Sequence, residues 1–149
     1  MTPSELEAYL HEHIPLSRAM GVRVASVGVA GLELAAPLAP NLNHHRTAFG
    51  GSIASLAVLT GWACLHLQLR EAVPRASLVI QKSDFSYLKP ILGDFTAFSP
   101  VPTGLEWERL LGALERKGRG RITLGAEVRY GGETVGRFTG DYVAVREKG

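Results

Sequence analysis

The stretch Asn41–Arg70, NLNHHRTAFGGSIASLAVLTGWACLHLQLR, decides how the rest of the chain is interpreted. It opens with a polar loop that contains two Asn and two His residues and leads to the pair Gly50-Gly51. We expect a buried helix from about Ser52 to Leu69, with Ser52 helping to cap it. The first turn of such a helix offers free backbone N–H groups and the positive end of the helix dipole, which suit a polarised carbonyl or an anion.

The composition predicts one globular domain over residues 1–149. Apolar residues make up 46% of the chain and charged residues 20%, which is ordinary for a protein with a core. The net charge is +2, and the densest basic run, Arg116–Arg121, is short, so we expect no nucleic-acid partner. The single cysteine, Cys64, excludes an internal disulfide and is expected to be a small buried side chain.

The amino-terminal residues Met1–Leu16 are acidic and amphipathic, without the apolar core of a secretory signal, so a cytoplasmic location is predicted. The 23 residues Thr47–Leu69 carry no formal charge and are long enough to span a bilayer. Polar side chains interrupt this segment, and its flanks are typical of β structure. We therefore expect a fully wrapped core helix and no membrane partner.

Alternating and turn-bounded segments predict an antiparallel sheet around this helix. The expected strands are Val22–Val27, Leu32–Leu38, Ala76–Leu88 as the longest, Asp94–Phe98, Ile122–Tyr130 and Thr134–Val145. Strict alternation within the longest strand places Ile80 and Asp84 on one face and Phe85 and Tyr87 on the other. Gly104–Leu114 fits either a short amphipathic helix or a long connection. The fold class is therefore α+β, with the sheet curled around the central helix.

Three segments resemble the acyl-CoA thioesterases of the hot-dog fold: Asn43–Gly51, Tyr87–Phe95 and Phe138–Tyr142. The first is similar to their N-x-x-G-T-x-H-G-G loop, the second to their Y-L-x-P…G-D segment, and the third to their last strand. The chain most closely resembles the thioesterase family named after the C-terminal domain of YiiD. The resemblance implies a curved antiparallel sheet around a long helix, a homodimer or tetramer with sites between protomers, and an acyl thioester of coenzyme A or acyl carrier protein as substrate. It implies no cofactor.

The resemblance also assigns roles to particular residues. Gly50 and Gly51 correspond to the donors of backbone N–H groups to the thioester oxygen, and Asn43 to a residue that organises the loop or positions water. The residues expected to contact substrate are Phe49, Ser52, Arg46 and Tyr87. The helix position that normally carries a carboxylate is Val58, the loop His is Phe49, and a loop Gly is Arg46. No Asp or Glu occurs between Leu34 and Leu69.

A base from elsewhere is then needed. Asp84 is one candidate, and a solvated strand residue is the other interpretation of it. The loop residues His44 and His45 have the side chain suited to proton transfer at neutral pH, although adjacent loop histidines are also common on surfaces. His66 is expected to be a core histidine that shares a helix face with Trp62. Gly61, in the middle of the helix, predicts a close approach by another element or a ligand.

Three functions remain open at this level. The first is an acyl thioesterase with a non-standard base. The second is a non-catalytic dimer that binds acyl groups or acyl-CoA, which the missing helix carboxylate favours. The third is a dimerisation module. No metal site is expected, because His44-His45 has no partners at ligand spacing and there is no cysteine cluster.

Overall fold

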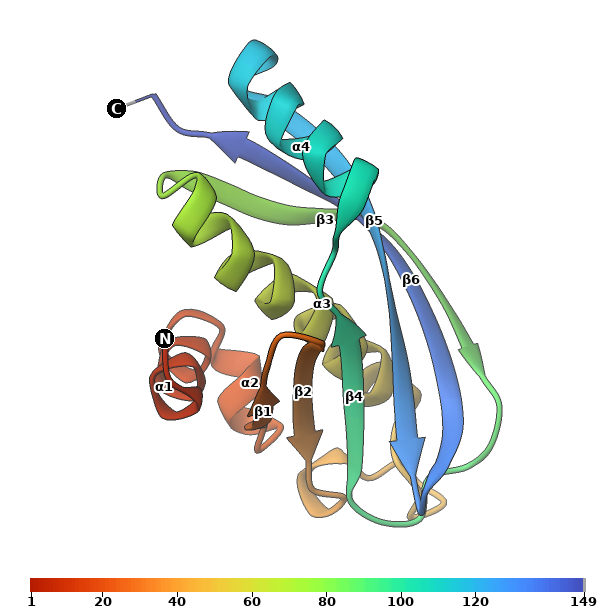
Figure 1. The fold of residues 1–149 in the computed structure, drawn as a ribbon. Helices are drawn as coiled ribbons and strands as arrows, with labels where there is room; N and C mark the ends of the chain where they lie inside the picture. Colours follow the sequence, from red (N-terminus) through yellow and green to blue (C-terminus); the bar gives the residue numbers. More distant parts are fainter. Residues whose placement is uncertain (149) are drawn as a thin grey trace.

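The computed structural model describes residues 1–148, in which a six-stranded antiparallel sheet curves around one long helix (Figure 1). The strand order is β1-β2-β4-β5-β6-β3. The elements are α1 (Pro3–His13), α2 (Pro15–Ala19), β1 (Arg23–Val27), β2 (Gly31–Ala36), α3 (Gly50–Ala72), β3 (Ala76–Tyr87), β4 (Phe95–Pro100), α4 (Gly104–Lys117), β5 (Arg119–Tyr130) and β6 (Glu133–Arg146). The predicted α+β class, with a curved sheet around a central helix, is confirmed.

The central helix α3 is a core helix. By length and composition it could cross a membrane, but 56% of its most apolar window is buried inside the protein. Leu56 and Leu65 are fully buried against side chains of the sheet, which include Leu34, Phe95 and Tyr142. Figure 1 shows α3 within the curve of the sheet, with α1 and α2 beside β1 and with α4 following β4. The sheet and the amino-terminal helices therefore bury most sides of α3.

Several expected boundaries need correction. α3 starts two residues before Ser52 and continues through Arg70 to Ala72. The segment after Gly104 is a helix of 14 residues, and it ends at Gly118, which has a left-handed φ of 77°. β6 has 14 residues and β3 has 12, so β3 is not the longest strand. β6 lies inside the sheet and pairs with both β5 and β3.

The middle of α3 meets β6 at Gly61. A Cβ on Gly61 would lie 2.5 Å from the hydroxyl oxygen of Tyr142, and this hydroxyl donates a hydrogen bond to the carbonyl of Val58 at 2.6 Å. Tyr142 is fully buried, and burial raises the pKa of its phenol, so it stays a hydrogen-bond donor. The predicted close approach at Gly61 is confirmed, and a strand side chain makes it.

β3 forms one edge of the sheet, and its register is irregular. The pairing with β6 shifts between Ile80 and Lys82. Before the shift, Ile80 pairs with buried Tyr142; after it, half-buried Phe85 pairs with buried Phe138. Both therefore face the core. The two residues would lie on opposite faces of a regular strand, so the irregularity explains why strict alternation grouped the side chains wrongly.

Candidate functional site

The loop before α3 is anchored by a buried asparagine. The Nδ2 of Asn41 donates to the carbonyl oxygens of Met20 and Pro37, at 2.9 and 2.7 Å. The N–H of Phe49 donates to the carbonyl of Asn41 at 2.7 Å, and the N–H of Ala48 donates to the carbonyl of Ile91 at 2.9 Å. These bonds tie the loop to the end of α2, to β2 and to the segment after β3, and they set where α3 begins.

Asn43 organises the turn inside this loop. Its Oδ1 accepts from the backbone N–H groups of His45 and Thr47, at 2.8 and 3.1 Å, and its Nδ2 donates to the Thr47 hydroxyl at 2.7 Å. Arg46 has a φ of 64°, in the left-handed region. The related loop motif has glycine at this position, and glycine adopts that conformation without a steric penalty. The turn geometry is thus kept although Arg46 replaces the glycine.

The start of α3 presents free backbone N–H groups. Phe49 is the N-cap residue, and in residues 1–148 no side chain caps this helix, so the expected capping by Ser52 is wrong. The N–H of Ile53 donates to the carbonyl of Phe49 at 3.0 Å. The earlier groups, on Gly50, Gly51 and Ser52, have no acceptor within the helix. Together with the helix dipole they favour a negatively charged oxygen.

Two aromatic rings flank these N–H groups. The ring of Phe49 is 55% exposed and lies where a Cβ on Gly51 would be, so only glycine fits beneath it in this position. The hydroxyl of Tyr87 donates to the carbonyl of Gly50 at 3.0 Å and joins the end of β3 to the start of α3. Both were expected to contact substrate. Phe49 and Tyr87 are positioned around the first turn, and their contact with substrate stays a prediction.

A hollow of about 380 Å³ lies beside Gly50. Its lining includes Thr47, Ile53, Tyr87 and Lys89. Lys89 also forms an ion pair with Glu133 at 2.9 Å, and both side chains are exposed at the edge of this hollow. The hollow therefore has a mainly apolar lining, with the Lys89 ammonium group at its edge, and it lies beside the start of α3.

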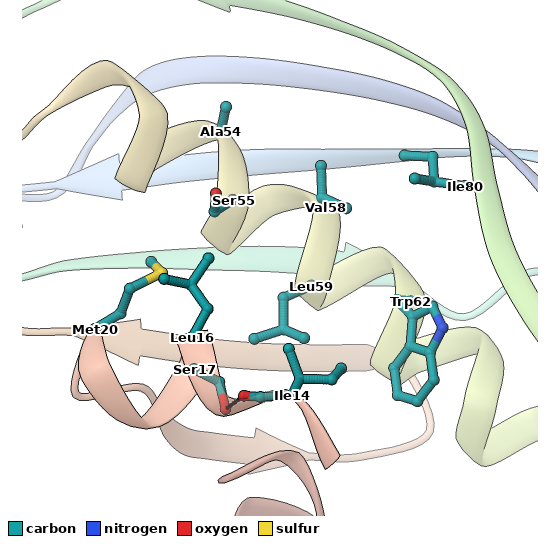
Figure 2. A pocket seen from close by; sticks show the side chains of 10 residues that line it. All are labelled: Ile14, Leu16, Ser17, Met20, Ala54, Ser55, Val58, Leu59, Trp62 and Ile80. Atoms are coloured by element: carbon teal, nitrogen blue, oxygen red, sulfur yellow. Dashed lines mark hydrogen bonds between the residues drawn. The ribbon is translucent and has the colours of Figure 1, made fainter. Parts of the chain in front are cut away.

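A second pocket, of about 300 Å³, runs along α3 between α2 and β3 (Figure 2). Its walls are Ile14, Leu16, Ser17, Met20, Ala54, Ser55, Val58, Leu59, Trp62 and Ile80. Val58, at the position where the resemblance expects a carboxylate, faces this apolar space. The amino-terminal residues in the wall could not be identified as site residues from the sequence, because nothing local indicates which helix face α2 covers.

The candidate bases lie in different parts of the structure. Asp84 is exposed and pairs with exposed Thr139, whereas its neighbour Phe85 faces the core. Asp84 therefore lies on the outer face of the sheet, opposite to α3, which agrees with its interpretation as a solvated strand residue. His44 and His45 are both exposed in the loop, with ring centroids 4.0 Å apart.

His66 lies away from the helix start. Its ring stacks on Trp62, with centroids 4.8 Å apart, as the predicted shared face requires, and on Tyr9 of α1 at 4.8 Å. Burial, and to a smaller extent the charges of Arg70 and His13, lower the pKa of His66. It is a packing residue between α1 and α3. Cys64 is also structural, because burial raises the pKa of its thiol to about 11.

Comparison with known proteins identifies the family. The model of the family described as "Putative thioesterase (yiiD_Cterm)" matches residues 3–146. The chain belongs to this family. The resemblance inferred from the loop and strand segments is therefore confirmed, and the family description implies a thioester substrate.

Solved structures agree with the family on the fold. A protein of unknown function from Chlorobaculum tepidum TLS is 29% identical, with a TM-score of 0.90 and 98% of each chain covered. A putative thioesterase from Shewanella oneidensis is 29% identical, with a TM-score of 0.85 and 96% of each chain covered. A probable thioesterase from Pseudomonas aeruginosa is 22% identical, with a TM-score of 0.82 and 97% of each chain covered, and this likeness shows the fold alone. The chain has the hot-dog fold of such thioesterases.

Proposed function

We propose that this protein is an acyl thioesterase that hydrolyses thioesters of coenzyme A or acyl carrier protein. One observation carries the proposal: the apolar pocket follows the face of α3 on which Gly51 lies in the first turn, where the backbone N–H groups are free. Gly51, Ser55, Val58 and Trp62 recur at helical spacing, and the last three line the pocket. A thioester carbonyl at Gly51 would therefore have its acyl tail along the pocket.

The proposed reaction is attack of water on this carbonyl. The water oxygen bonds to the carbonyl carbon, and its proton passes to a base. The negative charge that develops on the carbonyl oxygen is stabilised by the N–H groups of Gly50 and Gly51. The carbon–sulfur bond then breaks, the sulfur takes up a proton, and a carboxylic acid and a free thiol are released.

We assign the base to His45. It follows Asn43 in the loop that leads into α3, and its backbone N–H bonds to Asn43, which holds this part of the turn. Histidine side chains titrate near neutral pH and suit general base catalysis there. Asp84, on the outer face of the sheet, is not retained in this role.

The test is an acyl-CoA hydrolysis panel that measures release of the free thiol. His45→Gln is expected to lower turnover by at least about 10²-fold, the usual contribution of a general base. His44→Gln is the matched control in the same loop, and Asp84→Asn controls for the excluded carboxylate. Both controls should keep the activity of the unmodified protein. Full activity of His45→Gln, or loss of activity in Asp84→Asn, would reverse the assignment.

A second candidate function is a non-catalytic dimer that binds acyl groups or acyl-CoA. In residues 1–148, neither pocket beside α3 is lined by Asp, Glu or His. A ligand that binds only the folded protein raises its thermal stability. Thermal stabilisation by acyl-CoA without thiol release would therefore support this candidate. The absence of both effects would leave the third candidate, a dimerisation module.

The proposal includes a homodimer formed through β3, which in the described residues 1–148 pairs with β6 on one side and forms the longer edge of the sheet. Its outer-face residue Val79 is 60% exposed. An unpaired edge of this length presents a row of N–H and C=O groups to another strand. Light scattering should give the mass of a dimer or tetramer, and Val79→Lys should lower it. A monomer at micromolar concentration would contradict this part. A cytoplasmic location is proposed with it.

A further inference from the structure

The pocket along α3 has a fixed wall at one end. Figure 2 shows Trp62 and Ile80 at that end, and Ser55 and Met20 at the end nearer the start of the helix. The indole Nε1–H of Trp62 donates to the carbonyl of Leu78 at 2.9 Å. The Trp62 ring also stacks on His66 with an angle of 10° between the planes. The hydrogen bond and the stacking hold the indole in one orientation.

Further aromatic side chains pack behind the indole ring of Trp62. His66 stacks in turn on Tyr9 of α1, at 4.8 Å, and Trp62 and Tyr9 are themselves stacked at 6.5 Å. Trp62 cannot turn away without losing its bond to β3 and its packing against α3 and α1. A wall held in this way gives the pocket a sharp end rather than a flexible one.

The rise per residue of α3 gives an estimate of the length of the pocket. At about 1.5 Å per residue, Val58 is about 10 Å and Trp62 about 16 Å along the helix from Gly51. Carbon–carbon bonds of about 1.5 Å advance an extended chain by about 1.25 Å each. A chain that begins at Gly51 therefore reaches Val58 with about 8 carbons and the Trp62 backbone with about 13, and because the indole ring takes up part of that length, roughly 8 to 12 carbons fit. The volume of about 300 Å³ is at the lower end of small-ligand pockets, as expected for one narrow aliphatic chain.

The side chains that line the pocket also limit which acyl tails can bind. Among the described lining residues, hydroxyl groups occur on Ser17 and Ser55, and the Ser17 hydroxyl already donates to the carbonyl of Ile14 at 2.8 Å. Ser55 lies at the end nearer the helix start (Figure 2), so a hydroxyl or charge farther along the acyl tail would be buried beside Val58 and Leu59 without a partner. Unsubstituted aliphatic tails fit this surface.

We propose that Trp62 sets the upper length limit of the acyl chain and that the substrates are medium-chain aliphatic thioesters. The inference rests on the proposed acyl site, and Trp62 acts in it as a specificity-determining residue. Nothing in the inference requires hydrolysis, so binding and turnover test different parts of it.

The first experiment measures binding. The chain has two tryptophans, and Trp107 lies on α4 outside the pocket, so Trp107→Phe leaves Trp62 as the only indole. Its fluorescence is followed during titration with saturated fatty acids and acyl-CoA from about 4 to 16 carbons. The response should strengthen up to roughly 8 to 12 carbons and fall for longer chains. Affinity that is independent of length, or that keeps rising to the longest chain, would overturn the proposal.

The second experiment removes the side chain of Trp62, which closes one end of the pocket. Trp62→Ala should shift the preferred chain to longer acyl groups, in both binding and thiol release. Trp107→Ala is the matched control, because it removes an equal, half-buried side chain without touching the pocket. If Trp62→Ala does not fold, Leu59→Phe tests the same idea from the opposite side, since it should fill the middle of the pocket and favour shorter chains.

The outcomes separate the two proposals. Length-limited binding without thiol release means that hydrolysis is wrong and the limit set by Trp62 holds. Hydrolysis with an unchanged length preference in folded Trp62→Ala, or in Leu59→Phe, means that the thioesterase proposal holds and the limit does not.

Discussion

The start and the middle of α3 are built differently although both depend on glycine. At the start, Gly50 and Gly51 leave backbone N–H groups free, and the exposed ring of Phe49 lies over Gly51. In the middle, Gly61 receives the buried hydroxyl of Tyr142. Glycine therefore leaves backbone N–H groups accessible in the first turn of α3, and in the middle of the helix it makes room for a packed side chain. Changes at the start should alter chemistry, and changes in the middle should alter stability.

The largest effect is expected for Gly50→Pro, which removes one N–H at the first helical position. Proline suits that position, and Phe49, with φ −66° and ψ 132°, has the extended conformation preferred before proline. The fold should persist while thiol release falls about 10²–10³-fold, the usual loss of one oxyanion donor. Steady-state hydrolysis and circular dichroism measure the two effects.

Gly50→Ala is the control for that change, because it keeps the N–H. Its Cβ would lie 3.5 Å from the ring of Tyr87, an ordinary contact. Equal activity of the proline and alanine variants would remove Gly50 from the proposed site.

The next effect concerns the middle of the helix. Gly61→Val should lower the free energy of unfolding by about 1–3 kcal/mol, because buried Tyr142 has no room to move. Urea denaturation followed by circular dichroism gives this value. Gly112→Ala on α4 is the matched control: its Cβ would meet only the guanidinium end of Arg116, so stability should rise by up to about 1 kcal/mol. A Gly61→Val protein as stable as the original would contradict the packing role.

A smaller gain is expected for Arg46→Gly in the loop before α3. The left-handed φ of Arg46 costs about 1–2 kcal/mol, part of which the added backbone freedom of glycine offsets. We expect a net gain of about 0.5–1 kcal/mol in the free energy of unfolding, measured by urea denaturation. If Arg46 also contacts a phosphate of the substrate, KM rises in Arg46→Gly and is kept in Arg46→Lys. An unchanged KM would remove Arg46 from the substrate contacts.

The smallest effect is a pH dependence at the α1–α3 contact. His66 has a lowered pKa, with His13 and Arg70 as nearby positive groups and Tyr9 and Trp62 as stacking partners. The folded protein therefore binds this proton less readily than the unfolded chain, whose pKa is about 6.5. The stability that it contributes is present above pH 6.5 and falls as the pH drops below that value. Denaturation midpoints from pH 5 to 8 should show this decline, and His66→Phe should reduce it; parallel curves would contradict it.

Much of this fold could be predicted from local patterns. The uncharged run from Thr47 to Leu69 indicated a core helix, and the glycine at position 61 indicated a close approach, because both signals depend on neighbours in the chain. The face of Asp84 could not be predicted. The register shift between Ile80 and Lys82 changes which side chains face the core, and alternation along one strand does not report such a shift.

The amino-acid pattern alone is enough to predict one apolar helix at the centre and glycines after a polar loop at its start. These are local properties, because composition and spacing set helix formation and leave the first N–H groups free. The side chains that lie along the helix depend instead on how distant elements pack against it. Packing of α2 places Ile14 and Met20 opposite Val58, and pairing with β6 directs Asp84 outward. Both arrangements join residues far apart in the chain, where local periodicity carries no information.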